Sequence, residues 1–179
     1  GKVELDAPVC SYLPLFIMRD KRYKDITVRM TLCHTSGLPG SNYRNAMTDS
    51  WENDNHMEPY YEYWKYSKLK ADPGKFSVYC NDGFEVAAAI VEAVSGKSYI
   101  EFLREMITTP AGALTTGVGN IAIEQKKMMS CTGKNPEWVH AIGAGGIRTN
   151  LSDCARFGNL FLEPKGILKN ESLDEIVKP

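Results

Sequence analysis

A turn, a short extended segment and a helix start follow one another in the middle of this chain. Pro73-Gly74 predicts a turn that leads into an extended stretch ending in Tyr79-Cys80-Asn81. Alternate residues of an extended stretch point the same way. We therefore expect Tyr79 and Asn81 to present a phenol and an amide to one cleft, while Cys80 points away from it.

The residues after Asn81 carry an apolar pattern with a helical period. Asn81 or Asp82 is expected to cap this helix, and Gly96 to end it. Its predicted buried stripe has the spacing of one helical face and comprises Phe84, Ala87, Ala88, Val91 and Val94. A Ser-x-x-Glu capping box then predicts a second helix, with a stripe that comprises Tyr99, Phe102, Leu103, Met106 and Ile107.

A short helix is predicted earlier in the chain, capped by Thr27, with Val28 and Leu32 facing inward. Gly37 fits the position just after the end of this helix, and Pro39 prevents its continuation. Three later helices are predicted. One begins near Glu58 with Pro59 in its first turn, and one is capped by Asn150 with Asp153 three residues on. The third covers 171–178.

Bulk composition excludes several classes of partner. Of the 179 residues, 43% are apolar and 24% are charged, which is typical of a globular domain. The net charge of −1, with no lysine-arginine stripe, argues against a nucleic-acid partner, and no apolar run reaches the length of a membrane span. The five cysteines form no CxxC pair, so we expect mainly buried thiols and no metal or other cofactor.

Four stretches stand out in chain order: Leu5-Asp6-Ala7-Pro8-Val9 with Tyr12-Leu13-Pro14, 26–39 with His34-Thr35-Ser36-Gly37-Leu38-Pro39, 73–81, and Gly145-Gly146-Ile147 with 152–157. In this order they resemble the serine β-lactamase and penicillin-binding-protein family, closest to class C β-lactamases, D-alanyl-D-alanine carboxypeptidases and related esterases. Of these stretches only the Tyr-x-Asn element is catalytic in that family, whereas the His-Thr-Ser-Gly-Leu segment is the more distinctive one.

The resemblance implies roles for two residues. Enzymes of this family acylate a serine, and a lysine one helical turn later helps to remove its proton. By this resemblance Tyr79 is the proton-transfer group and Asn81 binds and orients the substrate amide. A phenol has a pKa near ~10, so it needs neighbouring cations to act as a base. The alternative from the residues alone is a core tyrosine and an ordinary helix cap.

The nucleophile motif of the family is not at its expected place, and neither Lys-Thr-Gly nor His-x-Gly occurs. The one Ser-x-x-Lys, Ser67 to Lys70, lies on the wrong side of Tyr79, and we interpret it as a solvated helix end. We therefore expect no nucleophile in this chain, no activity of residues 1–179 alone, and the middle of a larger serine hydrolase. Without the rest of the hydrolase, an apolar face of this subdomain would be exposed, and such a face favours self-association.

The expected fold is mainly α: the helical subdomain of the β-lactamase/transpeptidase-like α/β + α fold, with most of the antiparallel sheet domain absent. Residues 1–179 would form one such subdomain, with a polar and aromatic insert-like segment at 40–72. The substrate would be a β-lactam, a D-Ala-D-Ala stem peptide or an ester. Two other hypotheses stay open: a peptidoglycan- or peptide-binding module that lost the nucleophile, and an unrelated helical interaction domain.

The remaining candidates have structural interpretations. His34 follows a helix C-terminus, His56 has no ligand pattern, and His140 fits a surface or core role. The aromatic run 60–66 fits a core or amphipathic helix, with a wall or lid of the substrate cleft as the alternative. The glycine run 143–146 lacks a phosphate-loop pattern, so we interpret it as a close-packed turn before a helix.

Overall fold

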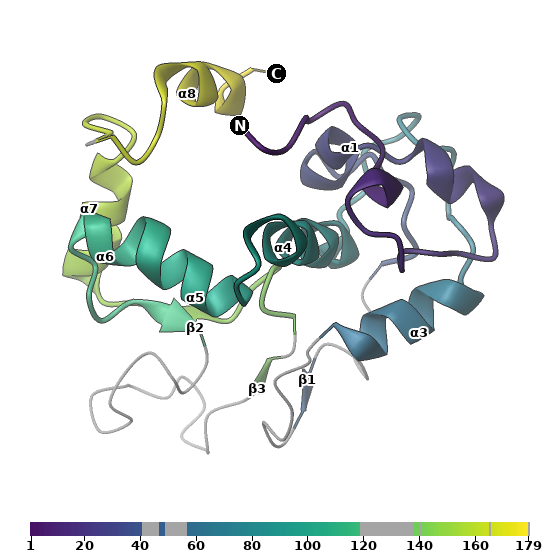
Figure 1. The fold of residues 1–179 in the computed structure, drawn as a ribbon, viewed down its shortest axis with the longest axis horizontal. Helices are drawn as coiled ribbons and strands as arrows, with labels where there is room; N and C mark the ends of the chain where they lie inside the picture. The colour runs from purple at the N-terminus through teal and green to yellow at the C-terminus, as the bar shows by residue number, and fades with distance from the viewer. Residues whose placement is uncertain (41–46, 49–56, 119–137, 140, 165, 179) are drawn as a thin grey trace. The chain divides into compact units, whose positions relative to one another are not determined.

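The computed structural model describes residues 1–40, 47–48, 57–118, 138–139, 141–164 and 166–178, and these residues are mainly helical (Figure 1). The helices, in chain order, are η1 (Val9–Ser11), η2 (Lys21–Asp25), α1 (Val28–Leu32), α3 (Glu58–Tyr66), α4 (Asn81–Ser95), α5 (Tyr99–Leu103), the π-helical η3 (Arg104–Thr108), α6 (Thr109–Ala111), α7 (Leu151–Asn159) and α8 (Asn170–Ile176).

The described strands form two small antiparallel pairs. In the first pair, β1 (Met47–Thr48) lies beside β3 (Trp138–Val139), with Met47 opposite Val139. In the second pair, β2 (Gly117–Val118) lies beside β4 (Ile147–Arg148), with Gly117 opposite Arg148. Each pair joins segments that are distant in the sequence.

The chain divides into two compact units, and each is described by itself. The first unit contains residues 1–99 and 135–146, and the second contains residues 100–134 and 147–179. The interpretation of 1–179 as one subdomain of a larger hydrolase stays a prediction. Within the predicted insert-like segment 40–72, residues 41–46 and 49–56 lie outside the described residues.

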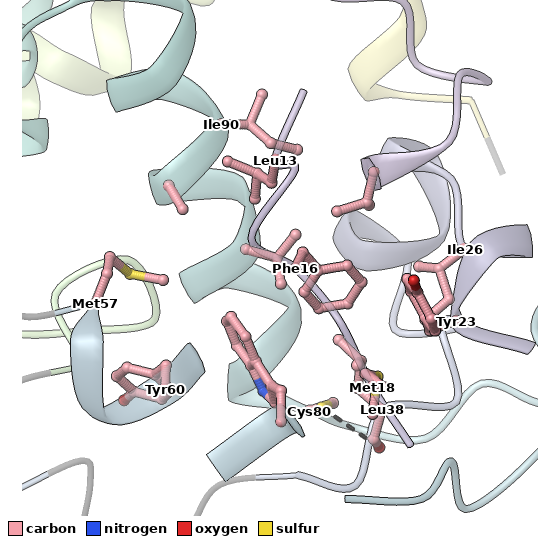
Figure 2. Close-up of a cluster of buried hydrophobic side chains, with 14 of the residues drawn as sticks. Leu13, Phe16, Met18, Tyr23, Ile26, Leu38, Met57, Tyr60, Cys80 and Ile90 are labelled. Atoms are coloured by element: carbon pink, nitrogen blue, oxygen red, sulfur yellow. Dashed lines mark hydrogen bonds between the residues drawn. The ribbon is translucent and has the colours of Figure 1, made fainter. Parts of the chain in front are cut away.

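Aromatic side chains centre the core of the first unit. The Phe16 ring meets the Trp64 ring edge to face at 5.3 Å and the Tyr23 ring at 5.9 Å. Figure 2 shows this cluster, where Tyr60 from α3, Met57 just before α3, and Ile90 from α4 join the N-terminal segment. Burying each such side chain contributes about 1.5–3 kcal/mol, so these contacts are the main support of the unit.

α1 and α4 approach each other closely at a glycine. A Cβ atom built on Gly83 would lie 2.5 Å from the carbonyl oxygen of Thr31, a distance at which the helices would have to separate. The predicted cap of α1 is confirmed, because Thr27 Oγ1 accepts a hydrogen bond from Met30 N at 3.3 Å. The inward position of Val28 is also confirmed, whereas Leu32 is exposed.

The residue that ends α1 differs from the prediction. The left-handed position after the cap Cys33 belongs to His34, with φ +59°, and not to Gly37. The amide of Thr35 donates to the carbonyl of Met30 at 2.9 Å, which is the long hydrogen bond of a Schellman motif. The helix therefore ends earlier than glycine placement indicated, and a histidine occupies a conformation that non-glycine residues seldom adopt.

The cap of α4 lies before the two expected positions, Asn81 and Asp82. Cys80 holds the N-cap position without a side-chain hydrogen bond, and Asn81 is already helical. The predicted stripe is largely wrong, since of its five residues only Ala88 is buried. The buried positions instead comprise Asp82, Gly83, Glu85, Val86, Ala88, Ala89 and Ile90. The face differs because two carboxyl side chains find polar partners inside the unit, which apolar periodicity does not register.

Local signals were accurate elsewhere. α3 begins at Glu58 with Pro59 in its first turn, and α4 ends at Gly96. In the second unit Asn150 caps α7 by accepting from the amide of Asp153 at 2.8 Å. The Asp153 carboxylate in turn accepts from the amide of Thr115 at 2.8 Å, which ties α7 to the segment before β2.

Candidate active site

Two of the stretches that suggested a resemblance lie side by side in the first unit. Two backbone hydrogen bonds join them. The amide of Gly74 donates to the carbonyl of Thr35 at 2.8 Å, and the amide of Val78 donates to the carbonyl of His34 at 2.9 Å. The turn after α1 therefore supports the extended segment that carries Tyr79.

The extended segment presents alternate residues to different environments. Cys80 has extended dihedral angles (φ −156°, ψ 112°) and is buried. Its Sγ lies 3.8 Å from the carbonyl oxygen of Leu38 (Figure 2), and burial raises the pKa of this thiol. Tyr79 is 72% exposed and Asn81 is half-buried. The exposure of Tyr79 excludes the core-tyrosine alternative, and Asn81 is not the helix cap.

His34 contacts the segment through its side chain as well as its backbone. Its ring centroid lies 4.9 Å from that of Tyr79 and 5.2 Å from that of Phe84. Its Nδ1 accepts a hydrogen bond from the amide of Cys80 at 3.2 Å. An accepting Nδ1 carries no proton, so this geometry assigns the imidazole proton to Nε2.

Lys70 contacts the backbone of the same segment. Its Nζ donates to the carbonyl oxygen of Tyr79 at 3.5 Å. Its positive charge also lowers the pKa values of Cys80 and Asp82, against the larger opposing effect of burial. Lys70 thus places a cation beside the backbone of Tyr79.

The Ser67–Lys70 motif does not have the geometry of a nucleophile and its base. Ser67 is the residue that ends α3, and its Oγ donates to the carbonyl of Tyr63 at 2.7 Å. Because α3 ends at Tyr66, Ser67 and Lys70 do not lie one turn apart on a helix. The interpretation of Ser67 as a helix end is confirmed.

Asp82 is a fully buried carboxyl group one residue beyond Asn81. Its Oδ2 accepts a hydrogen bond from the Trp64 indole nitrogen at 3.1 Å. Burial raises the pKa of Asp82 to about 6, although the Trp64 hydrogen bond and the charge of Lys70 oppose this change. Trp64 is thereby assigned to the core, so a cleft-wall role is excluded for it.

Glu85 is a second fully buried carboxyl group, one turn further along α4. Its Oε1 accepts from the amide of Ala144 at 2.8 Å, and no hydrogen-bond partner of Oε2 occurs among the described residues. Burial raises the pKa of Glu85 to about 8, with the backbone hydrogen bonds opposing. A Cβ atom on Gly143 would clash with the carbonyl of Phe84, so this turn is close-packed, as predicted, and the helix that it packs on is α4.

Sequence reasoning singled out Tyr79 and Asn81 but not the residues that contact their segment. His34 was interpreted as a structural residue after a helix, and Lys70 as part of a solvated end. Glu85 had a usable signal, because a glutamate stands within an otherwise apolar helical segment. His56 and His140 lie outside the described residues, as does Cys131, whereas the other four cysteines are unpaired.

Two kinds of feature are missing from the residues that the structure describes. No helix there combines the length and apolar character that crossing a membrane requires. Within the same residues, no three histidine, cysteine or carboxylate side chains are grouped as metal ligands.

The profile of the beta-lactamase family matches residues 1–177 of the chain. The chain belongs to the beta-lactamase family. A curated member, the D-alanyl-D-alanine-carboxypeptidase/endopeptidase AmpH of Escherichia coli K12, is 28% identical over 186 aligned positions, which cover 98% of this chain and 47% of the relative. The chain thus spans about half the length of this beta-lactamase-family protein.

Solved structures share the fold. A D-stereospecific amidohydrolase from Streptomyces sp. superposes with a TM-score of 0.75 at 21% identity, covering 99% of this chain and 58% of that one. The D-amino acid amidase of Ochrobactrum anthropi SV3 also gives 0.75, at 24% identity, covering 96% and 52%. The chain therefore has the β-lactamase/transpeptidase-like fold and belongs to a family of serine hydrolases.

Proposed function

We propose that the whole protein cleaves amide or ester bonds through an acyl-serine intermediate, and that residues 1–179 contribute its Tyr-x-Asn element. A serine elsewhere in the protein attacks the substrate carbonyl, and its proton passes by way of Tyr79 to the leaving group. Asn81 donates to, or accepts from, the substrate amide and holds the carbonyl in line. The fragment supplies positioning and proton transfer but no nucleophile.

The observation that carries this proposal is the environment of Tyr79. Its side chain is 72% exposed, although the backbone on both sides is held by His34 and the next residue, Cys80, is buried. An exposed phenol on a tightly held backbone is suited to meeting a substrate. A tyrosine that served only packing would be buried instead.

The substrate class proposed first is a peptide ending in D-Ala-D-Ala. The name of the E. coli relative supports this choice, since that protein is a D-alanyl-D-alanine carboxypeptidase and endopeptidase. A β-lactam or an ester is the alternative, because each also presents a carbonyl that a serine can attack, and the serine is acylated as a result.

Residues 1–179 by themselves are proposed to be inactive. The sequence offers one Ser-x-x-Lys, and the Ser67 hydroxyl of that motif is engaged with the Tyr63 carbonyl at a helix end. Without a serine activated by an adjacent base, the binding groups have no acyl acceptor.

Covalent labelling tests the assignment. Incubation with a fluorophosphonate, and separately with a penicillin, is expected to add one probe mass to the whole protein and none to residues 1–179. Intact mass spectrometry measures both. A labelled fragment would return attention to Ser67 and contradict the proposed location of the nucleophile. A whole protein that takes up neither probe would favour the peptide-binding module.

Residues 1–179 alone are expected to self-associate. Helix α7 and the turn after it carry large exposed apolar side chains, namely Leu151 (88%) and Phe157 (46%) in the helix and Phe161 (42%) and Leu162 (81%) after it. Exposed apolar surface of this kind favours association in water. Light scattering of residues 1–179 should report a mass above 20.0 kDa. A concentration-independent monomer would contradict the expectation.

A further inference from the structure

We infer that His34 is a positioning residue that holds Tyr79 in its catalytic orientation. This inference rests on the proposed function, because it assigns a role to His34 only through the phenol of Tyr79. The two residues are 45 positions apart in the sequence but in ring contact, with centroids 4.9 Å apart.

The backbone of His34 is held in an unusual conformation. It adopts φ +59° at the left-handed position after α1, where glycine is the common residue. The turn itself does not require an imidazole, since a glycine would meet the same backbone demand without steric cost. A side chain at this position therefore calls for an explanation beyond ending the helix.

The contacts of His34 flank Tyr79 on both sides. Its carbonyl accepts from the amide of Val78 at 2.9 Å, and its Nδ1 accepts from the amide of Cys80 at 3.2 Å. The amides of the two residues that flank Tyr79 are thus held by one residue. What remains free is the rotation of the exposed tyrosine side chain.

The imidazole ring limits that rotation. It lies against the Tyr79 ring at an interplanar angle of 44° and against Phe84 of α4 at 5.2 Å. The imidazole therefore lies in contact with both rings, Phe84 and Tyr79. Proton transfer depends on the phenol oxygen reaching its partner, and a displacement of about 1 Å can cost about 10²-fold in rate.

A double-mutant cycle in the whole protein tests the inference. His34→Gly removes the imidazole and keeps a residue that accepts the left-handed conformation. We expect it to lower kcat by about 10- to 100-fold while KM changes by less than about 3-fold. In a Tyr79→Phe background the same change should lower kcat by less than about 3-fold, since the phenol that His34 positions is absent.

Two controls isolate the effect. Cys33→Ala alters the exposed side chain of the preceding residue and should leave kcat unchanged. His34→Asn repeats the cycle if the glycine variant does not fold, since asparagine also accepts a positive φ. Thermal unfolding establishes that each variant is folded.

The outcomes separate this inference from the proposed function. An equal loss of kcat in both backgrounds would mean that His34 acts on the fold generally, and would overturn the positioning role while the role of Tyr79 stands. An unchanged kcat in the His34 variant would also overturn the positioning role of His34, and so would a rise in KM without a change in kcat. If Tyr79→Phe itself leaves kcat unchanged, the proposed role of Tyr79 fails and the inference fails with it.

Discussion

Replacing Tyr79 by phenylalanine in the whole protein is expected to lower kcat by about 10²- to 10⁴-fold, the range that a positioned proton-transfer group contributes. The substitution removes the phenol oxygen and keeps the ring that packs on His34. Because Tyr79 is largely exposed, the unfolding temperature should stay unchanged. Steady-state hydrolysis of a D-Ala-D-Ala peptide and of a chromogenic ester measures the effect.

Tyr66→Phe is the matched control for this variant. Tyr66 is 70% exposed, much as Tyr79 is, and lies at the end of α3. Its phenol has no part in the proposed mechanism, so its removal should leave kcat and KM unchanged. Retention of activity within about 3-fold by Tyr79→Phe would exclude tyrosine as the proton-transfer group.

The stability of the protein is expected to fall as the pH rises from about 5 to about 8, and Glu85→Gln should remove most of this fall. The pKa of Glu85 is raised from 4.5 to about 8 in the folded protein by burial. In the pH range between these values the folded state holds a proton that the unfolded state has lost. Stability therefore decreases by about 1.4 kcal/mol per pH unit for this one group.

The glutamine variant reproduces the protonated form. Its side-chain oxygen is still able to accept from the amide of Ala144, which Glu85 Oε1 contacts at 2.8 Å. The variant should match the parent chain near pH 5 and exceed its stability at pH 8 and above. Urea unfolding at pH 5, 6, 7 and 8 measures the difference.

Asp82→Asn is the companion variant. The pKa of Asp82 is raised from 3.8 to about 6, so its contribution is lost over a lower range, between about pH 4 and pH 6. Removing this carboxyl group should leave the slope above pH 6 in place. Parallel stability profiles for Glu85→Gln and the parent between pH 6 and 8 would disprove the raised pKa of Glu85.

Local structure followed from the sequence because its causes lie within a few residues. Thr27 and Asn150 cap their helices by bonding to amides three residues on, and Pro59 lies in the first turn of α3. The extended run to Cys80 also followed from its own residues. Interactions of this range are visible in the order of side chains alone.

The contacts of His34 with the Tyr79 segment and the burial of Glu85 were decided by the tertiary structure. The His34 ring meets Tyr79 because the turn after α1 pairs with a segment about 40 residues later, through Val78 and Cys80. Glu85 became a buried acid because a turn from near residue 144 closes over α4. The apolar periodicity predicted a different buried face for α4, because it does not register a turn that packs on the helix from a distant part of the sequence.

The sequence by itself therefore determined several helix starts, which family the motifs resemble, and that an extended stretch carries Tyr79 toward the start of α4. Only the tertiary structure decided that the His34 ring meets Tyr79, that Cys80 is buried next to the exposed Tyr79, and that two carboxyl groups lie inside the first unit. Helix ends depend on neighbours within one turn. Burial, ring contacts and the pKa values that follow from them depend on segments that meet only when the chain has folded.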